Sequence, residues 1–192
     1  MLLSKKTRQK YLKELGFYTG EIDGIIGVKS KAAYKALQDK YFTRAKDRDG
    51  LYGKNTDILL RNAYNVHLYC KNFELDEFKC ECGGKYCTSY PAVLKPQLLI
   101  NVQAIRDEDK QPITITSGMR CKPYNNSLTG SSPTSGHMKA KALDIRFSHT
   151  KSETGRKKVM AFFKKLKGYY YTYCNLGGSH PHMGEAIHIE VK

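Results

Sequence analysis

The stretch SGHMKAKALDIRF, residues 135–147, decides how the second half of the chain is interpreted. It places His137 seven positions before Asp144, which is flanked by apolar residues in a segment typical of a buried strand. A buried carboxylate is costly unless its charge is compensated, and either a metal ion or an arginine such as Arg120 or Arg146 would compensate it. The stretch therefore predicts a strand that carries one metal-bound or ion-paired carboxylate.

The segments on either side of this strand predict an α+β domain. The residues ITIT are β-branched and precede a Ser-Gly turn, as expected for a strand. Strands separated by helices, with few long apolar runs, favour a small and mainly antiparallel sheet. The expected strands are 113–116, one within 135–147, 169–174 and one within 184–192, and the expected helices lie within 90–108, past its prolines, and at 154–167.

The final segment EAIHIE adds a second imidazole, that of His188. His137, Asp144 and His188 together offer two imidazoles and one carboxylate, a set that suits Zn²⁺ and leaves a position for water. In an extended strand Glu190 shares a face with His188, whereas Glu185 would do so only through a turn or bulge. A carboxylate beside zinc-bound water is the general base that hydrolysis requires.

The first third of the chain contains a repeat. Asp-Gly, an apolar pair, Gly, and then Ser or Thr before a helical pattern recur at an offset of 26 positions, in residues 23–38 and 49–64. The Asp-Gly pairs predict tight turns, and Ser30 and Thr56 are expected to cap the helices that follow. With a preceding helix that ends at Gly16, this predicts a three-helix unit of roughly 65 residues.

Two resemblances follow from these segments. Residues 11–38, YLKELGFYTGEIDGIIGVKSKAAYKALQ, resemble the peptidoglycan-binding domain found beside many bacterial and phage wall hydrolases. The run FELDEF, ITITSGMRCKPYN, SGHMKAKALDIRF and EAIHIE resembles, over about residues 70–192, the zinc D-alanyl-D-alanine carboxypeptidase family, which includes vancomycin-resistance D,D-peptidases and phage L-alanyl-D-glutamate endolysins. We therefore expect a small N-terminal three-helix domain, 1–66, followed by an α+β zinc peptidase domain, 67–192.

The resemblance to the peptidase family also implies roles for individual residues. It implies three metal ligands, which are His137, Asp144 and His188. It implies that Glu185 is the catalytic base, that Arg120 holds substrate and the developing oxyanion, and that Ser135 contacts substrate near the metal.

The chain departs from the family pattern at two positions. Lys141 stands where the family usually has glycine, which affects the local turn and not the ligands. Ala186 stands where some members have a histidine, which leaves Glu185 as the stronger base and Glu190 as the alternative. The histidines of GGSHPHMGE are expected at the rim of the site.

These features together predict a zinc metallopeptidase that hydrolyses an amide bond of the bacterial stem peptide or crosslink, as a carboxypeptidase or an endolysin-like endopeptidase. The wall-binding domain would raise its concentration at insoluble peptidoglycan. The alternative is a non-catalytic wall-binding protein with a structural metal site, which would need no base.

The formal charge of +15 is divided between both halves of the chain. It would attract anionic wall polymers, and with no nucleic-acid recognition motif we expect no specific nucleic-acid partner. No apolar stretch approaches the roughly 20 residues of a membrane span, and the start of the chain does not read as a signal peptide. We expect a monomer that is made in the host cytoplasm and acts at the bacterial cell wall.

The six cysteines leave alternatives open. Four of them are candidates for a small metal knuckle, which are Cys80, Cys82, Cys87 and Cys121. Their spacing is not that of paired C-x-x-C hooks, so the sequence favours free or later oxidised thiols over a metal site.

Overall fold

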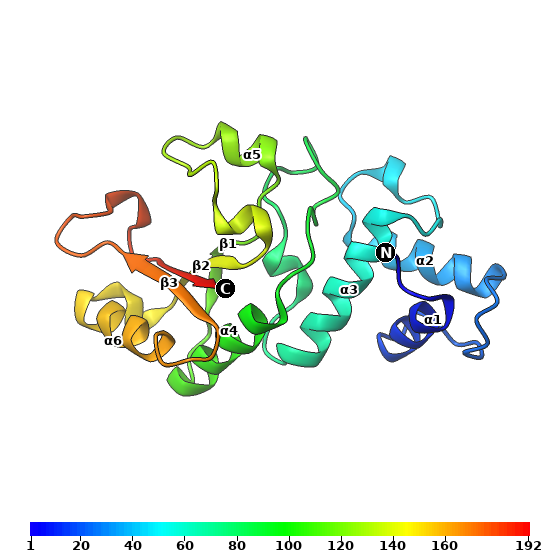
Figure 1. The fold of residues 1–192 in the computed structure, drawn as a ribbon, viewed down its shortest axis with the longest axis horizontal. Helices are drawn as coiled ribbons and strands as arrows, with labels where there is room; N and C mark the ends of the chain where they lie inside the picture. The colour runs from blue at the N-terminus through cyan, green and yellow to red at the C-terminus, as the bar shows by residue number, and fades with distance from the viewer.

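The computed structural model describes all 192 residues and shows an elongated molecule (Figure 1). Helices α1 and α2 lie at one end and the sheet with α6 at the other, while α3 and α4 pack together between them. The N-terminal helices are α1 (Lys5–Glu14), α2 (Val28–Tyr41) and α3 (Lys54–Tyr69), with the short η1 (Ala45–Asp47) between the last two. None of the helices combines the length and apolarity needed to cross a membrane.

Two buried glutamines hold the repeated Asp-Gly turns. The Nε2 of Gln9 donates to Asp23 Oδ1 at 2.8 Å, and the N–H of Gly24 donates to Gln9 Oε1 at 2.7 Å. Gln38 makes the equivalent two bonds to the second turn, at 3.1 and 2.7 Å. Because a buried amide must find partners for both its oxygen and its nitrogen, each glutamine fixes a turn to the helix before it.

The predicted capping role of Ser30 and Thr56 is wrong. The N-cap residues of α2 and α3 are Gly27 and Gly53, which have no side chain to cap with. Ser30 and Thr56 are each the third helical residue, and their hydroxyls donate back to carbonyls of the preceding turn, at 3.5 and 3.1 Å. These hydroxyls therefore stabilise the turn and not the free N–H groups of the helix.

The C-terminal part is α+β, as the sequence predicts. Its strands form one antiparallel sheet in the order β1-β2-β4-β3. The elements are η2 (Leu75–Phe78), α4 (Pro96–Asp109), β1 (Thr114–Ser117), α5 (Lys122–Ser127), η3 (Gly136–Lys139), β2 (Ala142–Arg146), η4 (Ser148–Lys151), α6 (Glu153–Phe163), β3 (Tyr169–Cys174), η5 (Pro181–Met183) and β4 (Ile187–Val191).

The two faces of the sheet have different environments. Alternate residues of β2 and β4 are apolar and fully buried, and α4 and α6 contact this side of the molecule. Burying a side chain of this size contributes about 1.5–3 kcal/mol, so the sheet is fixed firmly on its helices. The apolar residues are Leu143, Ile145, Ile187 and Ile189. The opposite face of the same strands carries Asp144, His188 and Glu190, as the period of two requires.

Helix α3 crosses the expected boundary between the two parts. It runs to Tyr69 and contacts α1, α2 and α4. Its Asn62 side chain donates to the carbonyl of Ala92 at 2.9 Å and accepts from the N–H of Leu94 at 2.8 Å. One apolar core extends through both parts. The division into 1–66 and 67–192 stays a prediction, and residue 66 lies within a helix.

Candidate metal centre

The register of the sheet brings together the three residues predicted to be metal ligands. Asp144 of β2 lies directly opposite His188 of β4, and His137 comes from η3, just before β2. Asp144 Oδ1 is 2.8 Å from His188 Nδ1 and 3.4 Å from His137 Nε2. All three side chains are buried, and one donor atom from each lies within 4.8 Å of the others. Residues that are far apart in sequence thus form one compact donor set.

His137 is oriented by the backbone around it. Its Nδ1 lies 2.7 Å from the carbonyl oxygen of Gly118, which can only accept a hydrogen bond. Nδ1 therefore carries a proton, and Nε2 faces Asp144, where a second proton or a metal ion would lie between the two atoms. The ring is presented by η3, which Ser135 caps by accepting from the His137 N–H at 3.3 Å and which ends at left-handed Ala140.

His188 is oriented by Glu190 and Tyr173. Its Nε2 lies 3.3 Å from Glu190 Oε2, and the Tyr173 ring stacks on it with centroids 4.7 Å apart. Glu190 Oε1 in turn pairs with Lys141 Nζ at 2.9 Å. Since Nε2 donates to Glu190, the close approach of Nδ1 to Asp144 needs a positive charge at that point. An imidazolium proton or a metal ion would supply it.

The charges of the site favour the ionised carboxylates. Burial raises the pKa of Asp144, but the hydrogen bonds from His137 and His188 outweigh burial and hold this pKa below its usual range. Burial likewise raises the pKa of Glu190, and its bonds to His188 and Lys141 bring that pKa below the ordinary value. Burial lowers the pKa of His188, but its bonds to the two carboxylates raise it overall. Two buried carboxylates beside two imidazoles give this point of the molecule an attraction for a cation.

The donor set fits zinc. Two imidazole nitrogens and one carboxylate oxygen are typical Zn²⁺ ligands, and three is the number of protein ligands that catalytic zinc sites use. The ring nitrogen of each histidine that faces away from Asp144 donates a hydrogen bond, to the Gly118 carbonyl or to the Glu190 carboxylate. Metal-ligating histidines are typically oriented by such bonds.

Arg120 lies at the same site and links Asp144 to β1. Its guanidinium donates to Ser117 Oγ at 3.0 and 2.8 Å and to Asp144 Oδ2 at 3.2 Å. The ion pair that the sequence offered as an alternative to a metal ion therefore exists on one carboxylate oxygen, while the other oxygen faces the two histidines. Arg146 is exposed and makes no such pair.

A cavity of about 580 Å³ opens over the donor set. Arg120 and Ser135 line it, their contacts with substrate staying a prediction, and three tyrosines of β3 form part of its wall. The tyrosines are Tyr170, Tyr171 and Tyr173. The loop of small polar residues from Leu128 to Gly136 forms another part of the lining.

The two candidate bases differ in position. Glu185 is exposed, just before β4, and lines an adjoining hollow of about 450 Å³ together with Arg120, Asp144 and His182. No hydrogen bond or ion pair engages its carboxylate. Both oxygens of Glu190 are engaged, as described above. His182 lines both hollows, consistent with its expected place at the rim.

Sequence reasoning missed several residues that support the site. Ser117 anchors Arg120, Tyr173 stacks on His188, and Lys141 pairs with Glu190. The register of the sheet explains the first two, since Ser117 pairs with Asp144 and Tyr173 with His188 across neighbouring strands. No regular spacing in the sequence identifies them, because each of these two pairings follows a register shift in its strand.

Comparison with known families gives one match. The family model described as Peptidase M15 matches residues 71–175, more than half of the chain, and no curated protein matches. The matched range contains Arg120, His137 and Asp144, while His188 follows it and is joined to Asp144 by the pairing of β2 with β4. The chain therefore belongs to the peptidase M15 family of zinc metallopeptidases.

Proposed function

We propose that this protein is a zinc-dependent peptidase that hydrolyses an amide bond of bacterial peptidoglycan, in the stem peptide or in a crosslink. The observation that carries the proposal is the donor set of His137, Asp144 and His188 on the floor of a cavity, with both imidazoles oriented from behind. Membership of the M15 family supports peptide hydrolysis as the reaction.

The residues of the chain have distinct roles in this proposal. Zn²⁺ held by the donor set would supply a Lewis acid that polarises the scissile carbonyl and lowers the pKa of water. Glu185, whose carboxylate is free, accepts the proton from the attacking water and returns it to the leaving amine. Arg120 faces the cavity and stabilises negative charge that develops on the carbonyl oxygen, and Ser135 contacts substrate at the wall.

The lining of the cavity supports a peptide with carboxylate groups as substrate. Lys139 lines it without an ion-pair partner, while Arg120 and Lys141 pair with Asp144 and Glu190, and the tyrosines of β3 offer flat surfaces for a peptide backbone. Stem peptides carry free carboxylates, so the charges are complementary.

The N-terminal helices and the net charge support action at the wall. The resemblance of residues 11–38 to peptidoglycan-binding domains and the charge of +15 both favour adsorption to an anionic, insoluble substrate. We propose that the protein acts as a monomer at the bacterial cell wall, as an endolysin-like enzyme. If the role is lysis, cleavage of a crosslink or of the L-Ala-D-Glu bond is favoured over removal of a terminal D-Ala, because only the former opens the wall.

The test is digestion of purified peptidoglycan by the zinc-loaded protein, with mass spectrometry of the released peptides. We expect new amine termini, whose fragment masses identify the bond. Glu185→Gln should lower turnover by about 10²–10⁴-fold, since general-base catalysis contributes this much. Zinc content should be unchanged in this variant.

Two outcomes would contradict the proposal. Near-normal turnover by Glu185→Gln would remove this residue as the base. Intact wall peptides beside tight wall binding would favour the non-catalytic binding protein.

A further inference from the structure

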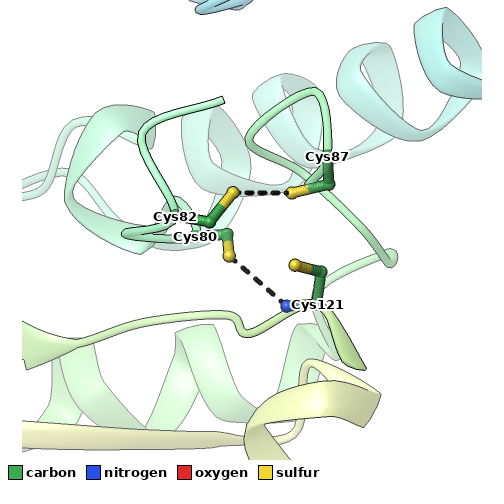
Figure 2. A group of neighbouring side chains, drawn as sticks. All are labelled: Cys80, Cys82, Cys87 and Cys121. Carbon is green, nitrogen blue, oxygen red and sulfur yellow. Dashed lines mark hydrogen bonds between the residues drawn. The ribbon is translucent and has the colours of Figure 1, made fainter. Parts of the chain in front are cut away.

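A second cluster of metal-ligating side chains lies outside the site described above. Cys80, Cys82 and Cys87 come from the loop after η2, and Cys121 is the N-cap residue of α5. Figure 2 shows the four side chains pointing toward one another. Their sulfur atoms all lie within 4.8 Å of one another. A residue 34 positions further along the chain thus completes a group of four thiols.

The spacing of the sulfur atoms is that of ligands around one ion. Tetrahedral zinc with Zn–S bonds of about 2.3 Å places neighbouring sulfur atoms about 3.8 Å apart. Cys82 Sγ and Cys87 Sγ are 3.5 Å apart, and the upper limit of 4.8 Å leaves only a small contraction for the rest. The four thiols alone supply the four ligands of a tetrahedral zinc ion.

The backbone of the loop is built to converge on these sulfur atoms. Gly83 and Gly84 have φ of +60° and +83°, which lets the chain turn tightly between Cys82 and Cys87. The N–H of Cys80 donates to the carbonyl of Ser89 at 2.8 Å and closes the loop at its base. The N–H of Cys121 donates to Cys80 Sγ at 3.3 Å.

That last bond favours a thiolate. A hydrogen-bond donor aimed at sulfur stabilises its charged form, which is the form that binds metal. Cys80 and Cys121 are buried while Cys82 and Cys87 are half-buried, so an ion could enter from the surface and then be enclosed.

We propose that Cys80, Cys82, Cys87 and Cys121 bind one structural zinc ion. All four positions are filled by protein, as in structural sites and unlike the three-residue set of the catalytic centre. The proposal does not depend on the peptidase activity, because it concerns different residues and a different readout.

The position of the cluster gives the ion a mechanical role. Cys121 follows Arg120, and the N–H of Met119 donates to the carbonyl of Phe78 at 2.9 Å. Gly118, whose carbonyl orients His137, lies so close to Phe78 that an added Cβ would stand 2.5 Å from the Phe78 oxygen. A metal ion would join residues 80–90, here called the cysteine loop, to Cys121. It would therefore hold in place the segment that orients His137 and contains Arg120.

The cysteine loop also contacts the N-terminal part. Ser89 Oγ lies 2.5 Å from Thr43 Oγ1, and Tyr90 packs edge-on against Tyr41. Fixing the loop would thus also fix the N-terminal helices against the catalytic part.

The test is the metal content of the full chain purified under reducing conditions, measured by inductively coupled plasma mass spectrometry. We expect two zinc ions per chain in the wild type and one in Cys82→Ser/Cys87→Ser. His137→Ala/His188→Ala should retain the cysteine-bound ion alone. Cys174→Ser is the matched control and should retain two, because this thiol lies outside the cluster.

Cobalt substitution gives a second readout, which is spectroscopic. Thiolate ligation of Co²⁺ produces intense charge-transfer absorption in the near ultraviolet, whereas ligation by imidazole and carboxylate does not. The wild-type protein should show this absorption, and so should His137→Ala/His188→Ala. It should be lost in Cys82→Ser/Cys87→Ser.

Three results would overturn the proposal. One is a wild-type cobalt protein that lacks the thiolate absorption. Another is an intact mass, without reductant, that is lower by two hydrogens for each cysteine pair, which would show disulfides. The third is iron in place of zinc in the wild-type protein, which would overturn the choice of metal.

Discussion

At the scale of single residues, the two glutamates that flank His188 are in different chemical situations. Glu190 accepts from the imidazole and pairs with Lys141, so its proton affinity is low and its oxygens are occupied. Glu185 is exposed beside Arg120 and Asp144 at the adjoining hollow. We infer that Glu190 is a positioning residue and that Glu185 is free to exchange protons with substrate and water.

Gly136 offers a test of the positioning role. A Cβ at this residue would stand 2.6 Å from the Glu190 carboxyl carbon, which must then move away from His188. We expect Gly136→Ala to lower zinc affinity at the catalytic centre by about 10–100-fold, the usual effect of losing a bond that orients a ligand. Competition with a chelator measures it. Gly27→Ala is the matched control, since nothing lies within 4 Å of its added Cβ, and equal zinc affinity in both variants would contradict the role.

At the scale of secondary-structure elements, the start of α3 depends on one buried carboxylate. Asp57 accepts from the Leu3 N–H at 2.7 Å, the Tyr52 hydroxyl at 2.8 Å and Arg61 Nε at 2.7 Å. Burial raises the pKa of Asp57, but these bonds lower it below its ordinary value. The group thus ties the N-terminal segment and the second turn to α3.

The sign of this pKa shift predicts how acid acts on the fold. Because the folded-state pKa of Asp57 is depressed, its contribution to stability is full above about pH 4 and is lost as pH falls through the folded pKa. Asp57→Asn should lower the free energy of unfolding at pH 7 by about 1.5–3 kcal/mol, the range for hydrogen bonds to charged groups. Urea denaturation at several pH values measures both effects. An acid dependence as steep in Asp57→Asn as in the wild type would contradict the assignment.

The elements also show how far the sequence alone leads. Local patterns predict the longer helices, the four strands and the antiparallel sheet but not the short α5, and the alternation in β2 and β4 places Asp144 and His188 on one face. The turns of the N-terminal repeat are equally visible. Gln9 and Gln38, which hold these turns, are not, because they lie 29 positions apart while the turns recur at 26.

The unpredicted part consists of contacts that only tertiary structure creates. The ion pair of Lys141 with Glu190 and the approach of Cys121 to the other three cysteines join residues distant in sequence. The sequence favoured free or oxidised thiols, since the fourth cysteine lies outside the dense group. Metal-site motifs defined by sequence spacing detect only cysteines that are close along the chain. Here the packing of η2 against β1 brings Cys121 to the other three cysteines.

At the scale of the whole molecule, the N-terminal and C-terminal parts share one apolar core, and both parts carry net positive charge. The proposed attraction of the +15 charge to anionic wall polymers would act through long-range forces that salt screens. Binding to purified walls should weaken as ionic strength rises from 0.1 M to 1 M, where the Debye length falls from about 10 Å to about 3 Å. Pull-down at several salt concentrations measures this. Walls stripped of anionic polymers are the control, and the same salt dependence on stripped walls would contradict an attraction to these polymers.

The claim on which the account depends is that His137, Asp144 and His188 hold zinc at the floor of the cavity. The most direct test is an anomalous difference map from crystals of the zinc-loaded protein, recorded on both sides of the zinc absorption edge. The account predicts a peak in contact with His137 Nε2, His188 Nδ1 and Asp144 Oδ1. No peak at this point in a crystal of the zinc-loaded protein, or zinc held by other atoms of these residues, would contradict it.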